Sequence, residues 1–349
     1  MEESPSFINS ILQTYSPSVG TRDNGNSPSI ERICTKSDTG LQPFTLGNIT
    51  VQFSLLLTMI DGKICNVLAR SSSMKCYICG TKISQMNNLG FLQQSEDTSN
   101  FVFGLSILHA HIRFFECILH ISYRLEFKKW KANVRDGSRE IMKKRKKTIQ
   151  DAFRNRLGLI IDTPKPGYGT TNDGNTARTF FENTKEASEI TGVDYDLISR
   201  FSVILTTISC FQNISESRFN IYCRKPAELF VKLYPCYYMP PTLHKILIHG
   251  ASILKSALLP IGQLSEEAME SLNKTVRRFR QDHTRKMSRI TTNFDLFHRL
   301  FLASDPLISN RRELSKKKRT QLPLQVLQLL STPEGPNSED SGDSDSEDE

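Results

Sequence analysis

The sequence lacks any long uninterrupted run of apolar residues. Its 349 residues are 38% hydrophobic and 23% charged, and even the apolar stretch from Phe53 to Ile60 is broken by Ser54 and Thr58. A helix that spans a membrane needs about 18–20 apolar residues in succession. The amino terminus also lacks the basic start and the apolar segment of a secretory signal. We therefore expect a protein that is neither secreted nor partnered with a membrane.

Motifs of several common enzyme classes are missing as well. The chain has no GxxxxGK[ST] loop, no GxSxG turn and no HExxH helix, so nucleotide hydrolysis, esterase chemistry and zincin chemistry have no support. We expect no small-molecule substrate. The eight cysteines, in a chain without a secretory signal, are better interpreted as free thiols or metal ligands than as a disulfide framework.

Charge is unevenly distributed along the chain. The net charge is +8, from 45 Lys and Arg against 37 Asp and Glu. Eight of the acids follow residue 330, where there is no Lys or Arg, so residues 1–330 carry 29 acids and a net charge of +16. A basic body with an acidic tail is typical of a protein that binds polyanions and carries its own electrostatic competitor. Nucleic acid is the expected polyanion.

Hydrophobic periodicity predicts a mainly helical chain that follows a strand. Residues 1–45 are rich in Ser, Asn, Gly and Thr and are predicted to be mostly disordered. Residues 48–61 are β-branched and apolar, and predict a strand that ends at the turn dipeptide Asp61-Gly62. Helical spacing predicts helices near residues 104–130, 177–183, 185–209, 226–233, 242–256 and 266–285.

Cys76-Tyr77-Ile78-Cys79 has the spacing of two thiolate ligands on one tetrahedral zinc ion. The same spacing also fits two small buried residues, and a lone pair is weak evidence. The partners left open by the sequence are His109 with His111, Cys117 with His120, and His244 with His249. The last pair lies far along the chain, so its zinc would be structural and would join the two ends of a large insertion. Such a zinc ion would lower the entropic free-energy cost of closing this loop by about 4–5 kcal/mol.

Two other features have both a functional and a structural interpretation. In the helix near 266–285, Glu270 lies opposite Leu272, Val276 and Phe279, so its carboxylate is either part of a solvated ion-pair face or a metal ligand flanked by phosphate contacts. The cationic residues from 128 to 147, with Trp130, and those at 316–319 fit a nucleic-acid contact, a nuclear-import signal or a solvated helix face.

Four landmarks in the order found here resemble the Transib transposase family and the related catalytic subunit of the V(D)J recombinase. The resemblance covers about residues 46–305, and its last landmark, a histidine pair followed by E-S-x-N-K-x-x-R-R-F-R, is the most specific. The first landmark is a strand ending at Asp61 with Cys76 and Cys79 after it, and the second is LHAHI at 108–112. The third is GNTAR at 174–178. The fourth is LHKILIH at 243–249, followed by ESLNK at 270–274 and RRFR at 277–280.

The resemblance implies a partial RNase H-like core of α+β class with a large helical insertion that bears structural Zn²⁺. Asp61 and Glu270 correspond to the second catalytic Asp and the catalytic Glu of a site that binds two Mg²⁺ or Mn²⁺ ions. The resemblance also makes Cys76, Cys79, His244 and His249 the zinc ligands, in preference to His109 and His111. It places five cations near the nucleic-acid path: Arg178, Lys274, Arg277, Arg278 and Arg280.

The sequence departs from the family at the first catalytic Asp. The Asp residues before Asp61 are Asp23 and Asp38, and neither has the apolar flanks of a buried strand. The chain is thus expected to be the carboxy-terminal portion of a transposase, from a fragmentary gene model, a decayed element or a domesticated gene. Whether it is an enzyme is left open by the resemblance.

The sequence therefore predicts a nuclear, transposase-derived DNA-binding protein with an incomplete DDE site, inactive as this chain, and a homodimer is an assembly that the family allows. One alternative is an active endonuclease and strand-transfer transposase, completed by upstream sequence and acting on terminal inverted repeats. Another is a zinc-stabilised nuclear interaction protein. The expected parts are residues 1–45 (disordered), 46–75 (core strand), 76–262 (zinc-bearing insertion), 263–310 (Glu-bearing helix) and 311–349 (basic cluster and acidic tail).

Overall fold

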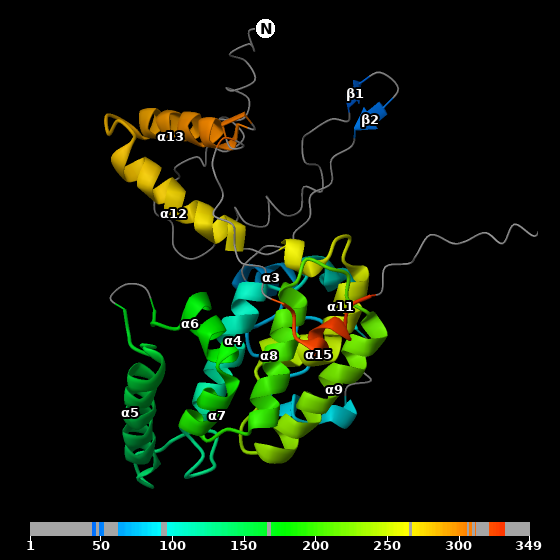
Figure 1. The fold of residues 1–349 in the computed structure, drawn as a ribbon, viewed down its shortest axis with the longest axis vertical. Helices are drawn as coiled ribbons and strands as arrows, with labels where there is room; N and C mark the ends of the chain where they lie inside the picture. The colour runs from blue at the N-terminus through cyan, green and yellow to red at the C-terminus, as the bar shows by residue number, and fades with distance from the viewer. Residues whose placement is uncertain are drawn as a thin grey trace, which may run out of the picture. The chain divides into compact units, whose positions relative to one another are not determined.

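A computed structural model describes residues 44–46, 49–51, 62–91, 96–165, 169–264, 267–305, 307–308, 311 and 321–331. The described part of the chain is predominantly helical, which confirms the coarse fold class (Figure 1). The RNase H-like core stays a prediction. None of the described helices is long and apolar enough to span a membrane. The longer helices are α4 (Ile107–Ser122), α5 (Ser138–Leu157), α8 (Tyr195–Ser209), α9 (Glu216–Leu233), α12 (Glu267–Asp282) and α13 (Arg289–Ser304).

The chain separates into two units, Met1–Leu55 and Leu56–Glu349. In the first, β1 (Phe44–Leu46) and β2 (Ile49–Val51) form an antiparallel hairpin whose register pairs Phe44 with Val51. β2 lies within the strand predicted for residues 48–61, and the rest of that strand, including Asp61, lies outside the described residues. The next described element is α3 (Gly62–Leu68).

α4 lies at the centre of the helical body. Apolar residues recur along it every three or four positions, and the side chains of Phe114, Phe115, Ile118 and Leu119 are completely buried. The ring of Phe114 contacts Phe201 of α8 at a centroid distance of 4.8 Å. Two shorter helices, α6 (Gly174–Glu182) and α7 (Thr184–Thr191), complete this layer beside α4 and α8 (Figure 1).

Helix boundaries differ from the predicted ones at three places. α4 ends at Ser122, eight residues before the predicted end at residue 130. The single helix predicted at 185–209 is two helices, because Gly192 ends α7 with a left-handed backbone (φ 70°) and the carboxylate of Asp194 caps the amino terminus of α8. α9 begins ten residues before the predicted start at residue 226. It continues through Pro226, since the loss of one backbone hydrogen bond is offset by burial of Phe219, Cys223 and Phe230.

A very close backbone approach holds the segment before α12 against the body. Gly262, in the 3₁₀ helix η5 (Ile261–Leu264), is buried beside the end of α8. A Cβ atom at this position would lie 2.1 Å from the carbonyl oxygen of Cys210. Only glycine therefore fits here without movement of the backbone.

Residues 321–331 return to the helical body near the carboxyl end of the chain. They include α15 (Leu324–Leu327), which contacts α8 (Figure 1), and Val326 and Leu330 are buried. Leu330 forms an antiparallel bridge with Ile214, and the amide of Ser331 donates to the carbonyl of Asn213. Ser331, three residues before the first acid of the tail, Glu334, is thus attached to the loop between α8 and α9.

α12 and α13 pack against each other. α12 spans Glu267–Asp282, close to the predicted 266–285. Phe279 and Val276 are half-buried as the helical wheel predicts, whereas Leu272 on the same side is 42% exposed. A bidentate ion pair between Arg285 and Asp295 fixes the turn between the two helices.

Candidate metal centre

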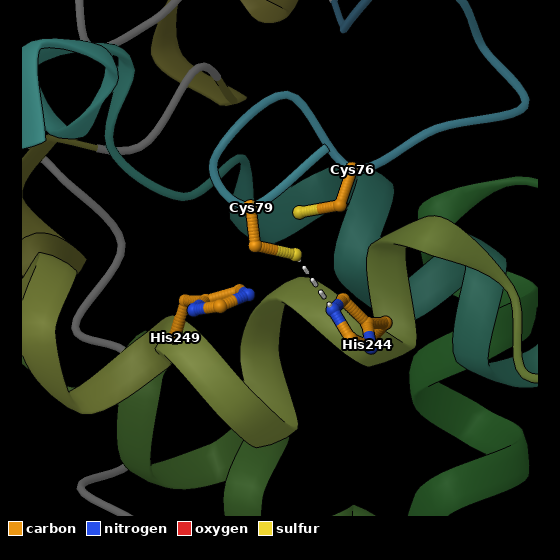
Figure 2. Close-up of side chains that lie close together, drawn as sticks. All are labelled: Cys76, Cys79, His244 and His249. Carbon is orange, nitrogen blue, oxygen red and sulfur yellow. Dashed lines mark hydrogen bonds between the residues drawn. The ribbon is translucent and has the colours of Figure 1, made fainter. Parts of the chain in front are cut away.

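Cys76 and Cys79 lie in a tight loop closed by backbone hydrogen bonds. The amide of Cys76 donates to the carbonyl of Thr81, the amide of Gly80 donates to the carbonyl of Cys76, and Lys75 forms a β-bridge with Lys82. Gly80 adopts φ 70°, a left-handed conformation that glycine accepts at no steric cost. The loop turns both cysteine side chains toward the same side (Figure 2).

His244 and His249 face the cysteines because the helix between them changes its winding. Residues five apart on an α-helix point about 140° away from each other, at 100° per residue. Here α10 (Pro241–His244) passes into a π-helical turn, η4 (Lys245–His249), before α11 (Gly250–Ser256). A π-helix joins residues i and i+5, so it aligns the two histidines one turn apart. Their ring centroids are 5.2 Å apart.

The structure brings together the four residues that the sequence analysis named as metal ligands. One ligand atom from each of Cys76, Cys79, His244 and His249 lies within 4.8 Å of the other three (Figure 2). The Sγ of Cys79 is 3.4 Å from Nε2 of His244. The usual bond lengths of a tetrahedral zinc site place two ligand atoms roughly 3.3–3.8 Å apart, so this pair already has the separation of two zinc ligands.

The donor atoms and their burial fit a zinc ion. His244 and His249 are 0% and 1% exposed, and Nε2 of His249 is buried without a hydrogen-bond partner. A buried polar nitrogen with no partner is costly unless it binds a further group. Two thiolates and two imidazoles form a complete tetrahedral set with no position for a water molecule. A metal held here would therefore be structural rather than catalytic.

Of the two thiols, Cys79 is the one that loses its proton more readily. The neighbouring thiol of Cys76 holds the pKa of Cys79 well below its usual range despite burial, and His244, His249 and Thr81 beside it act in the same direction. The same pairing with Cys79, together with burial, raises the pKa of Cys76. Because the thiolate is the metal-binding form, Cys79 is prepared for coordination.

Glu96 orients one histidine, and sequence reasoning missed it. Nδ1 of His249 lies 2.5 Å from Oε1 of Glu96, which leaves Nε2 pointing toward the cysteines. Burial lowers the pKa of His249, but the neighbouring Cys79 and Glu96 outweigh this effect and raise it. A carboxylate that accepts from the second nitrogen of a metal-binding histidine is a common feature of zinc sites.

One contact joins the cysteine loop to the histidine segment directly, and a second joins residues that flank them. Nζ of Lys245 donates to the hydroxyl of Tyr77 and lies 4.7 Å from the centroid of its ring. The side chain of Asn87 donates to the carbonyl of Tyr237 and accepts from the amide of Met239, just before α10. The protein thus holds the two ligand pairs together through contacts of its own side chains.

The other candidate partners lie outside this group of four. Nδ1 of His109 contacts the hydroxyl of Ser106, and Nδ1 of His111 contacts the carbonyl of Ile107, so both rings bond within the first turn of α4. His120 contacts the hydroxyl of Tyr237, and burial raises the pKa of Cys117 well above its usual value. Among the described residues, the only group with metal-ligand geometry is the Cys2His2 group.

Replacing Glu96 with alanine is expected to weaken zinc affinity about 10–100-fold. The reason is that His249 would lose the acceptor that fixes its ring and tautomer. Competition with a chromogenic chelator measures the affinity, and the visible spectrum of the Co²⁺ form reports whether four ligands remain. Glu96→Gln keeps an acceptor oxygen and should retain most of the affinity. Equal affinity in the wild type and Glu96→Ala would show that Glu96 does not orient the ligand.

The residues predicted for catalysis and DNA contact are described only in part. Asp61 lies outside the described residues. Glu270 belongs to α12, but its side chain is not among the described ones. Lys274, Arg277, Arg278 and Arg280 are exposed on α12, and Arg178 is half-buried on α6. Gly174, one turn before Arg178, packs so closely on α4 that a Cβ atom would lie 2.4 Å from Leu108.

A scan against models of protein families finds no match, and a search of curated proteins finds none either.

Proposed function

We propose that this protein is a transposase-derived DNA-binding protein whose helical body is fastened by a structural zinc ion and whose two-metal catalytic site is incomplete. The supporting observation is the Cys2His2 group, because its ligands occur in the order and spacing of the Transib landmarks. The last landmark continues into α12, which carries Glu270 and a row of exposed cations. The proposed location is the nucleus.

Electrostatics supports DNA as the partner. Lys274, Arg278 and Arg280 are exposed within two turns of one helix, and residues 1–330 carry a net charge of +16. Cations that neutralise phosphates release counterions, so the logarithm of the binding constant should fall with the logarithm of salt concentration by about 0.9 per contact. Such contacts position a protein on DNA and do not by themselves read its sequence.

The catalytic part of the proposal concerns two carboxylates. Asp61 and Glu270 are the residues that correspond to the family's second and third acids. Phosphoryl transfer by two metal ions requires carboxylates that hold both ions in place. With two of the three acids matched, the ions would be held poorly, and misplacement of about 1 Å costs such chemistry roughly a hundredfold in rate.

We expect this chain to bind duplex DNA in a salt-dependent way and not to nick it. Fluorescence anisotropy between 50 and 200 mM salt tests the binding, and a supercoiled plasmid with Mg²⁺ or Mn²⁺ tests the nicking. Glu270→Gln should bind DNA like the wild type. Nicking that disappears in Glu270→Gln would instead establish an active nuclease. Absence of salt-dependent binding would leave the zinc-stabilised interaction protein as the better description.

A further inference from the structure

The cations of α5 separate into two sets according to what they contact. This 20-residue helix carries the run of bases from Lys143 to Lys147. One side of it, marked by the buried side chains of Ile149 and Phe153, packs against the body. The cations beside this inner side have partners in other elements, whereas those on the outer side do not.

Three inner cations attach α5 to its neighbours. Arg145 donates to the carbonyls of Ser122 and Thr191, at the ends of α4 and α7. Lys146 forms an ion pair with Asp162, and Arg156 forms ion pairs with Glu186 and Glu189 of α7. These contacts fix the rotation of α5 about its own axis.

The outer cations are Lys143, Lys144 and Arg154. At about 100° per residue, they lie roughly 100–160° away from the line midway between Ile149 and Phe153. All three side chains are exposed, and within the described part of the chain none of these side chains forms an ion pair or a hydrogen bond. At 1.5 Å per residue, Lys143 and Arg154 are about 16 Å apart along the helix.

Two acids share the outer side, and neither forms an ion pair with these three cations among the described residues. Asp151 is paired with Lys147 one turn away. Glu140 lies in the first turn, where a carboxylate interacts favourably with the helix dipole. The structure thus holds an array of unpaired positive charge on a helix that its own inner cations keep from rotating.

We infer that the outer face of α5, formed by Lys143, Lys144 and Arg154, is a second DNA-contact surface, separate from α12, that binds backbone phosphates without reading bases. Duplex DNA presents one negative charge per about 1.7 Å of its axis, so a row of cations about 16 Å long can reach several phosphates. The inference rests on the proposed function, since it assumes that the chain binds DNA.

The test compares two triple variants with the same change in charge. The first is Lys143→Gln, Lys144→Gln and Arg154→Gln. The control is Arg224→Gln, Lys225→Gln and Lys232→Gln, which removes three exposed cations of α9 that also lack ion pairs among the described residues. Affinity for a 20-base-pair duplex is measured by anisotropy across a salt series, with zinc content and melting temperature as checks of folding.

We expect the α5 variant to lose at least about tenfold in affinity at 100 mM salt and two to three units of the log–log salt slope, at about 0.9 per phosphate contact. The α9 control should lose less than threefold. Equal losses in the two variants would show that only net charge matters and would overturn the inference, while the proposed function would stand. If the wild type itself shows no salt-dependent binding, the proposed function fails instead.

Discussion

Replacing Cys79 with serine is expected to abolish stoichiometric zinc binding and to lower the melting temperature by about 8–16 °C. A ligand present at a thousand times its Kd stabilises the folded state by about 4 kcal/mol, and each kcal/mol corresponds to about 2–4 °C for a body of this size. A serine hydroxyl replaces a thiolate that lies 3.4 Å from Nε2 of His244. Metal content after dialysis and thermal unfolding measure the two effects.

The matched control is Cys236→Ser, because Cys236 is a half-buried free cysteine outside the Cys2His2 group. It should retain one equivalent of zinc and unfold within about 2 °C of the wild type. A chelator should lower the melting temperature of the wild type and the control but not of Cys79→Ser. If Cys79→Ser keeps its zinc and its melting temperature, the four-ligand assignment is wrong.

Replacing Gly262 with alanine is expected to destabilise the protein by about 3 kcal/mol or more, or about 6–12 °C in melting temperature. The new Cβ atom would lie 2.1 Å from the carbonyl oxygen and 2.6 Å from the carbonyl carbon of Cys210, and 2.9 Å from the carbonyl oxygen of Ser209. All three are backbone atoms, so no side-chain rotation can relieve the overlap. η5 would have to separate from α8.

Gly62→Ala provides the control for this prediction. Nothing lies within 4 Å of a Cβ atom at Gly62, and alanine has the higher helix propensity. This variant should therefore unfold at the wild-type temperature or slightly above it. Denaturant unfolding of both variants gives the free energies directly. A Gly262→Ala protein as stable as Gly62→Ala would contradict the close approach of η5 and α8.

The sequence predicted α4, whose apolar spacing is regular, and missed α5, whose surface is polar. α4 was predicted because its buried residues recur every three or four positions. α5 was seen only as a cationic stretch, since its inner side offers few apolar residues and is held largely by Arg145, Lys146 and Arg156. Contacts of this kind depend on partners that are distant in sequence, so the hydrophobic periodicity of the helix does not indicate them.

The metal centre was also predicted only in part from the sequence. Residue spacing alone left three candidate pairs of further ligands for a zinc ion at Cys76 and Cys79. The family resemblance selected the pair His244 and His249. Spacing failed because His109 and His111 have equally suitable side chains, and their local bonds within α4 emerge only in the folded structure. The π-helical turn and the contact with Glu96 had no sequence signal, because both arise from tertiary packing.

The separation of the ligand pairs has a consequence for the order of folding. The cysteine pair is complete once Cys79 is synthesised, but His244 follows after 164 further residues, which takes about 8–33 s at about 5–20 residues per second. During that interval α4 to α9 can pack before the second half of the centre exists. Zinc uptake by a nascent chain would therefore be a late step, and it would report that the helices between the two ligand pairs have already packed together.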